Sequence, residues 1–425
     1  MGVATITSST LSNGMPLHRI AVPGTRATTL LVAFDAGART ERADENGMAH
    51  FLEHLVFKGG EKYRTYRDVN SAAEGIGAVL NAYTSHDLVA FHITARAERA
   101  LEAADLLTDF VGRPRIDGGE LDRERGVVVQ EIARANDQPA TIAEHLIDEA
   151  VFGDHPLGRP VLGTEEHIST TFTREGIVAF RSRRWSPARG AAFVVGNLDF
   201  LTSLDNGTAG LDELFGRFEP QAEPNAYEPA PGPRHTLLVH ERDSNQSHLR
   251  MSYRPAVDVS SPRERAALAI YSTLLGGSMG SRLFDEIREQ RGLAYSVHSV
   301  PHAYADVPVL QLSAGLESSK LVEAYRRMRD IVSELRDHGA TEEEVGRARA
   351  YAGGARTIAF ENTGAVARHA AQQAVVYGED VNPDRSIKLL DAVTLEQVND
   401  VAGRIADELS VACVGPHTVE ELEAA

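Results

Sequence analysis

A proline-rich stretch near the middle of the chain limits the folds that this sequence can adopt. Residues 217–234 read Arg-Phe-Glu-Pro-Gln-Ala-Glu-Pro-Asn-Ala-Tyr-Glu-Pro-Ala-Pro-Gly-Pro-Arg, with no apolar periodicity. Proline lacks a backbone donor and has a fixed φ, so this stretch is incompatible with a helix interior or a central strand. We therefore predict a linker over 217–234 between two domains, 1–216 and 235–425, each of an ordinary size.

The two halves show a similar order of predicted elements. In each half an apolar, β-like run precedes a long helical pattern, and later strands alternate with amphipathic helices. The predicted strands are 28–34, 90–94, 236–240, 248–253 and 309–313; helical patterns begin near 46 and cover 97–111, 121–132, 263–275 and 319–335. This order indicates a distant duplication of an α+β unit.

Composition excludes several classes of protein. Of the 425 residues, 42% are hydrophobic and 24% are charged, which is ordinary for a soluble globular chain and not for a fibrous or disordered one. No apolar run approaches the ~20 residues of a membrane helix, and residues 1–22 lack the apolar core of a signal peptide. Cys413 is the only cysteine, so no intrachain disulfide can form. We expect a cytoplasmic protein that does not enter a membrane.

The charge balance argues against nucleic acid as a partner. Asp and Glu number 61 against 43 Lys and Arg, a net charge of −18, and an acidic surface repels phosphate backbones. The same surface favours cationic partners such as basic peptides, although solubility alone explains it equally well.

Residues 47–57, Gly-Met-Ala-His-Phe-Leu-Glu-His-Leu-Val-Phe, contain the most informative pattern. From Met48 to Phe57 the only polar residues are His50, Glu53 and His54, and their spacing places them on one helix face. The rest of the circumference is apolar, so the helix should be buried. Two buried imidazoles and a carboxylate without partners would be costly. A divalent metal on His50 and His54 would remove that cost, with Glu53 beside an open coordination position.

A hydrolytic zinc site needs a third protein ligand, and the helix predicted over 121–132 offers a candidate. Glu124 and Glu131 are two turns apart on a stripe that otherwise points into the core. A buried Glu131 would serve as the ligand, and Glu124 would orient one of the ligands. The alternative interpretation is that these glutamates lie on a solvated face and the histidines are hydrogen-bonded core residues.

His-x-x-Glu-His is the inverzincin motif, and the chain resembles the pitrilysin-type (M16) zinc metallopeptidases. It is most similar to the short bacterial members related to the mitochondrial processing peptidase. The matching segments are 37–41 (Gly-Ala-Arg-Thr-Glu), 57–60 (Phe-Lys-Gly-Gly), 81–84 (Asn-Ala-Tyr-Thr), 158–163 (Gly-Arg-Pro-Val-Leu-Gly), 276–284 and 288–295, with Glu124 and Glu131 at the family's spacing from His54. The common Gly-Thr after Phe-Lys is Gly59-Gly60 here, which changes no catalytic residue.

The resemblance implies a role for each matching residue. His50, His54 and Glu131 would bind one zinc ion per chain, Glu53 would be the general base, and Glu124 would support the ligands. The edge strand formed by Asn81, Ala82, Tyr83 and Thr84 would pair with an extended substrate. Arg288 and Tyr295, from the second half, would hold the substrate near the scissile bond.

The resemblance also implies a fold and an assembly. The implied fold is α+β, with two homologous domains, each an antiparallel sheet with helices packed on one face. The implied function is that of a zinc-dependent endopeptidase for peptides or short unfolded segments. Larger relatives close a chamber with four such domains, so a chain with two implies a homodimer, or a heterodimer with a related subunit. Two other functions stay open: a non-catalytic scaffold subunit of a heteromeric complex, and a module that binds peptides without cleaving them.

Overall fold

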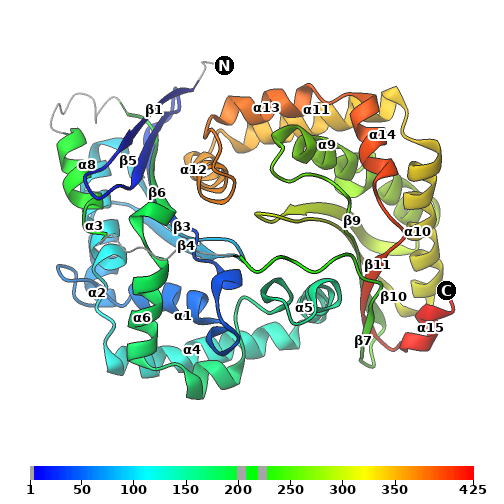
Figure 1. Ribbon diagram of the computed structural model, residues 1–425, viewed down its shortest axis with the longest axis horizontal. Coiled ribbons are helices and arrows are strands. Elements are labelled where there is room, and N and C mark those ends of the chain that lie inside the picture. The colour runs from blue at the N-terminus through cyan, green and yellow to red at the C-terminus, as the bar shows by residue number, and fades with distance from the viewer. Residues whose placement is uncertain (1–3, 199–206, 219–226) are drawn as a thin grey trace. The chain divides into compact units, whose positions relative to one another are not determined.

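The chain folds into two compact units, seen here in a computed structural model that describes residues 4–198, 207–218 and 227–425 (Figure 1). Unit 1 comprises Met1–Ile132, Pro160–Tyr227 and Ile358–Asp384, and unit 2 comprises Ala133–Arg159, Glu228–Thr357 and Arg385–Ala425. Each unit thus includes a segment from the other half of the sequence. Residues 219–226 of the predicted linker lie outside the described residues, and 227–234 form no helix or strand. The division into domains at 217–234 stays a prediction.

Unit 1 is built on a six-stranded sheet. Its order is β1-β2-β6-β3-β5-β4, with β2 and β6 parallel and every other neighbouring pair antiparallel. The strands are β1 (Thr5–Thr10), β2 (Pro16–Ala21), β3 (Ala27–Phe34), β4 (Val79–Thr84), β5 (Val89–Arg96) and β6 (Gly190–Gly196). Strand β4 is at one edge of this order and pairs with β5 alone, which leaves its outer side without a strand neighbour among the described residues.

Unit 2 repeats this arrangement with five strands. Its order is β7-β11-β8-β10-β9, with β7 and β11 parallel and the other pairs antiparallel. The strands are β7 (Leu237–Glu241), β8 (Gln246–Tyr253), β9 (Ala294–Ala303), β10 (Pro308–Glu317) and β11 (Leu409–Gly415). Order and directions match β2-β6-β3-β5-β4 of unit 1, which confirms the predicted duplication of an α+β unit. One parallel pair in each sheet is the difference from a purely antiparallel arrangement.

One face of each sheet packs against several helices. In unit 1 these helices are α1 (Met48–Val56), α2 (Tyr66–Gly75), α3 (Ala100–Gly112), α4 (Gly118–Asp137), α6 (Arg174–Arg184) and α8 (Gly207–Phe215). In unit 2 they are α9 (Pro262–Ser272), α10 (Leu321–His338), α11 (Glu342–Ala359) and α14 (Leu395–Gly403). Two further helices are α13 (Pro383–Asp391) and α15 (Val419–Glu423). The elements predicted from the sequence agree with these bounds to within a few residues.

The opposite face of each sheet carries a helix that the sequence analysis did not place there. In β3, Leu30 and Val32 face the main core, whereas Leu31 and Ala33 face the other side. There they pack against α12 (Thr363–Ala371), the orange helix beside this sheet in Figure 1. Because both faces of β3 are apolar, both must be covered, and helices on one face alone cannot do this.

Unit 2 covers its sheet in the same way with α5 (Pro139–Phe152). Ile147 and Ala150 of this helix share a buried cluster with Val309 of β10 and Ala412 of β11. Both of these helices come from the other half of the sequence: α12 covers the sheet of unit 1, and α5 covers the sheet of unit 2. No helix among the described residues has the length and apolar character to cross a membrane.

Candidate metal centre

The start of helix α1 is fixed by a buried carboxylate. Glu41 accepts hydrogen bonds from the backbone N–H groups of Gly47 (2.9 Å) and Ala49 (2.7 Å), which helix geometry leaves without partners. Burial raises the pKa of Glu41 to about 8, and these hydrogen bonds oppose that rise. Gly47 has φ 94°, and a Cβ there would lie 2.7 Å from the Cα of Gly163. Any side chain in place of Gly47 would therefore clash with Gly163 and disturb the start of α1.

Helix α1 and helix α4 bring three ligating side chains together. The Nε2 atoms of His50 and His54 lie 3.8 and 3.4 Å from Oε2 of Glu131. One ligand atom of each residue lies within 4.8 Å of the others, and no other such trio involving these residue types occurs in the described ranges. Tetrahedral zinc with ligand bonds of ~2.0–2.2 Å places its ligand atoms ~3.3–3.6 Å apart. The two histidine–glutamate separations are close to that value, so the residues fit a shared zinc ion.

His50 is prepared to act as a neutral ligand. Burial, together with the nearby charge of His54, lowers the pKa of His50 to about 4, so the imidazole is unprotonated at neutral pH. Its Nδ1 is buried without a hydrogen-bond partner in the described part of the chain. A metal bond at Nε2 would compensate part of the cost of burying this imidazole.

His54 is oriented by a carboxylate and a lysine. Nδ1 of His54 lies 2.9 Å from Oε1 of Glu124, and Nζ of Lys58 lies 2.5 Å from Oε2 of the same carboxylate. Burial lowers the pKa of His54, but the hydrogen bond to Glu124 and the surrounding carboxylates outweigh it and raise that pKa overall. With Nδ1 engaged by Glu124, Nε2 of His54 is directed to Glu131, the arrangement common for metal-binding histidines.

Glu53 connects the helix to the edge strand of the sheet. Thr84, the last residue of β4, donates its hydroxyl to Oε2 of Glu53 at 2.5 Å. Burial raises the pKa of Glu53, while the Thr84 hydrogen bond and the charge of His54 lower it and the charge of Glu131 raises it. A carboxylate with a raised pKa beside a metal position is suited to accept a proton from water near neutral pH.

The predicted substrate strand has its outer side exposed. Asn81 is exposed, while Ala82, Tyr83 and Thr84 are half-buried along β4. The side-chain oxygen of Asn81 accepts a hydrogen bond from the N–H of Ala82 at 2.9 Å. An incoming strand would have to replace this contact to pair with β4.

Arg288 and Tyr295 form a local pair in unit 2. The guanidinium of Arg288 lies 4.7 Å from the ring centre of Phe284 and 5.8 Å from that of Tyr295. Tyr295 is 84% exposed, which is high for an aromatic residue. The role predicted for this pair toward the metal residues of unit 1 stays a prediction.

One predicted detail of the site is wrong, and two of its residues were not predicted. Glu131 was expected to be buried, but its side chain is 42% exposed, whereas Glu124 is buried as expected for a supporting residue. Lys58 and Glu41 were noted only as parts of matching segments, and neither received a role. The spacing of Lys58, four residues after His54 and two after the end of α1, is the signal that could have identified it, because residues four apart lie close together where a helical turn continues.

Lys58 gives a test of the support around His54. Lys58→Met keeps most of the side-chain length but removes the charge that fixes Glu124. Zinc affinity should fall about 10–100-fold, the usual cost of losing a residue that orients a metal ligand. Competition with a chelator of known zinc affinity measures the zinc dissociation constant of each variant. Lys62→Met is the matched control, since Lys62 is exposed and pairs with Asp105 instead. Equal zinc affinity in wild type and Lys58→Met would show that the lysine does not support the site.

Comparison with known proteins places this chain in a family. A family model described as insulinase (peptidase family M16) matches residues 20–165, and one described as the peptidase M16 inactive domain matches residues 171–351. An uncharacterized zinc protease of Streptomyces coelicolor is 30% identical over 98% of this chain and 90% of its own length. One of Mycobacterium leprae is 32% identical over 97% of this chain and 92% of its own length.

A solved structure agrees on the fold. A protease from Helicobacter pylori aligns with a TM-score of 0.88 at 20% identity, covering 98% of this chain and all of the other. The two family models together match most of the chain, and the sequence relatives match nearly all of it. The chain therefore belongs to the M16 peptidase family.

Proposed function

We propose that the protein is a zinc-dependent endopeptidase that hydrolyses peptides or short unfolded segments. One observation supports this above the others: Glu53 adjoins the His50, His54 and Glu131 group and is hydrogen-bonded to Thr84 of the edge strand. In this proposal one compact unit supplies the base, the metal position and the surface for an extended peptide. The names of the sequence relatives support zinc as the metal.

In this proposal each residue has a defined task. The peptide adds to the outer side of β4 through main-chain hydrogen bonds, which favours extended segments over folded proteins. Zinc at His50, His54 and Glu131 would supply a Lewis acid that polarises the scissile carbonyl and makes water more acidic. Glu53 accepts the proton of the attacking water and returns it to the leaving amine. Glu124 and Lys58 keep His54 in the tautomer that presents Nε2 to the metal.

A chelator experiment tests the function and separates it from the non-catalytic alternatives. The purified protein is incubated with an unstructured fluorogenic peptide, with and without a zinc chelator, and zinc is then restored. Cleavage that stops with the chelator and returns with zinc supports the proposal. Peptide binding without cleavage in the zinc-loaded protein would favour a binding module or scaffold subunit.

Tyr295 is proposed to donate a hydrogen bond to the developing oxyanion. Tyr295→Phe removes one hydroxyl from a largely exposed ring, so thermal stability and zinc content should hardly change. Loss of one oxyanion donor lowers kcat about 10–10³-fold with little change in KM. Steady-state kinetics of peptide cleavage measure the two constants. Tyr351→Phe is the control, because Tyr351 is also an exposed tyrosine of unit 2. Unchanged kcat in Tyr295→Phe would make it an ordinary surface residue.

The active assembly is proposed to be two chains around a chamber, most simply a homodimer. The family's larger members use four domains, and one chain here contains two units of matching topology. With a chain mass of 46.0 kDa, light scattering coupled to size exclusion should give about twice that mass for the active species. Full activity in a strictly monomeric fraction would contradict this, and activity that requires a second related chain would indicate the heterodimer.

A further inference from the structure

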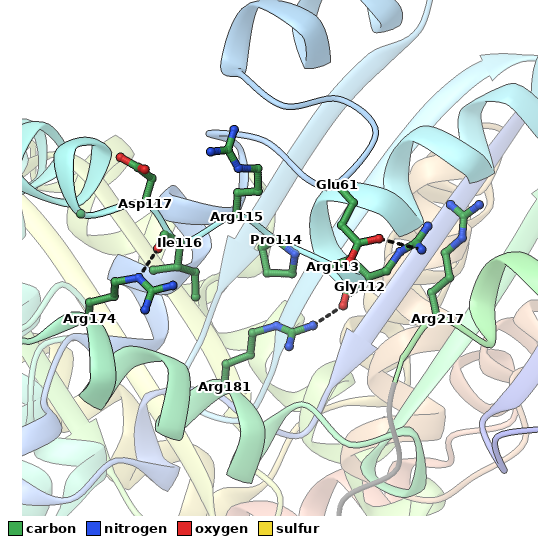
Figure 2. A pocket seen from close by; sticks show the side chains of 11 residues that line it. Glu61, Gly112, Arg113, Pro114, Arg115, Ile116, Asp117, Arg174, Arg181 and Arg217 are labelled. Carbon is green, nitrogen blue, oxygen red and sulfur yellow. Dashed lines mark hydrogen bonds and ion pairs between the residues drawn. The ribbon is translucent and has the colours of Figure 1, made fainter.

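An arginine-lined pocket in unit 1, separate from the metal residues, has no role in the proposed hydrolysis (Figure 2). Its cavity volume is about 550 Å³, within the usual range for small-molecule sites. Five arginines line it, against two carboxylates. They come from three places: the connection between α3 and α4 contributes Arg113 and Arg115, helix α6 contributes Arg174 and Arg181, and Arg217 follows α8.

Three of the arginines have clear structural contacts. Arg113 lies 2.9 Å from Glu61, and Arg217 lies 2.9 Å from Asp105. Arg181 donates to the carbonyl oxygens of Val111 and Gly112 at the end of α3. These contacts explain why the fold needs those three side chains. The same three side chains also line the pocket.

The remaining two arginines, Arg115 and Arg174, are hydrogen-bonded to backbone carbonyls. Nε of Arg174 donates to the carbonyl of Ile116 at 2.6 Å, and Nη1 of Arg115 donates to the carbonyl of Arg64 at 3.1 Å. Neither lies within ion-pair distance of a carboxylate in the part of the chain that the structure describes. A carbonyl orients a guanidinium but does not cancel its charge. Figure 2 shows Arg174 and Arg181 reaching from α6 toward the 112–116 backbone.

The carboxylates of the lining do not balance this charge. Glu61 is paired with Arg113, and Asp117 accepts the N–H of Gly119 (2.9 Å) at the start of α4. The excess of positive charge is local, because the whole chain carries −18. Repulsion between like charges that line one pocket destabilises the folded state unless a bound anion offsets it. Guanidinium groups are the side chains best matched to phosphate oxygens, which they bind in bidentate fashion.

We propose that this pocket binds a small molecule bearing phosphate groups. Its size exceeds that of one phosphate ion and suits a compact metabolite with one or two such groups. Long polyanions fit less well, because a chain with a net charge of −18 repels them. The pocket adjoins the start of α4, the helix that carries Glu131, through Asp117 and Gly118, and Glu61 lies in the loop between α1 and α2. A ligand here would steady the start of α4.

Calorimetric titration with fructose 1,6-bisphosphate at fixed pH and 150 mM salt tests the proposal, with inorganic phosphate and succinate as comparison probes. We expect binding of the bisphosphate, weaker binding of phosphate, and none of succinate at the same concentrations. Arg115→Gln and Arg174→Gln together remove the two uncompensated charges and should weaken bisphosphate binding at least a hundredfold, since each charged hydrogen bond contributes about tenfold or more. Arg99→Gln, at the far end of α3, is the matched control and should bind like wild type.

Two further readouts keep the test decisive if the double variant folds poorly. Phenylglyoxal labelling of the unaltered protein, read by peptide mass spectrometry, should show that the bisphosphate protects Arg115 and Arg174 but not Arg99. Protein freed of zinc by dialysis against a chelator should bind the bisphosphate with the same affinity as the zinc-loaded protein, which excludes binding through the metal. Absence of bisphosphate binding, equal affinity for succinate, or equal loss of affinity in Arg99→Gln would overturn the proposal. None of these outcomes bears on whether the protein cleaves peptides.

Discussion

Glu53→Gln should lower kcat/KM for peptide cleavage about 10²–10⁴-fold, the range for loss of a general base. Glutamine has the size of glutamate and can still accept the hydrogen bond from Thr84, so the local structure should persist. It cannot accept the proton of the attacking water. Zinc content should remain at the wild-type level, because the ligating group consists of His50, His54 and Glu131. Steady-state kinetics with parallel elemental analysis measure both quantities.

The control for this substitution is Glu74→Gln, which makes the same chemical change at an exposed position at the end of α2. It should leave kcat/KM unchanged. Wild-type cleavage by Glu53→Gln would show that another group accepts the proton. A loss of zinc together with activity would instead show that Glu53 contributes to metal binding.

Replacement of both histidines, His50→Ala with His54→Ala, should abolish zinc binding and with it peptide cleavage. Glu131 alone, with a side chain 42% exposed, offers one oxygen ligand to an ion that prefers four donors including nitrogen. We expect about one zinc per chain in the wild type and a background level in the double variant, measured by elemental analysis after dialysis. His240→Ala, an exposed histidine of unit 2, should retain zinc fully. Zinc at full stoichiometry in the double variant would contradict the site.

Much of the fold could be predicted because its strongest signals are local. The apolar run in 28–34 and the helical patterns of 97–111 and 319–335 correspond to β3, α3 and α10. The exchange of α5 and α12 between the two units could not be predicted in this way, because periodicity shows that a helix has an apolar face but not which sheet it covers. One signal was available: the unbroken run Leu30–Phe34 is typical of a strand buried on both faces.

That exchange affects where the chain can be divided. A fragment of residues 1–216 would lack α12, and Leu31 and Ala33 of β3 would then be exposed to water. Such a fragment is therefore a poor substitute for unit 1 in experiments. The full chain should be used to test the metal site.

Some residues of the candidate site could be predicted from local spacing and others could not, and helix geometry explains part of the difference. His50, Glu53 and His54 lie within five residues of one helix, where spacing alone determines the shared face. Glu124 and Glu131 are seven residues apart, and a helix turns ~20° short of two full turns over that interval. This rotation is consistent with Glu131 lying closer to solvent than Glu124. Arg288 and Tyr295 depended on family resemblance, since no local pattern connects them to residues so distant in the sequence.

The most direct test of the central claim is cleavage of a mixed peptide library, with the products identified by mass spectrometry. The zinc-loaded wild type should produce internal cleavages that vanish with a chelator, return with zinc, and are absent or at least a hundredfold slower in Glu53→Gln. Internal cleavage that persists undiminished in Glu53→Gln, or no cleavage by the zinc-loaded wild type, would contradict the assignment of a zinc endopeptidase.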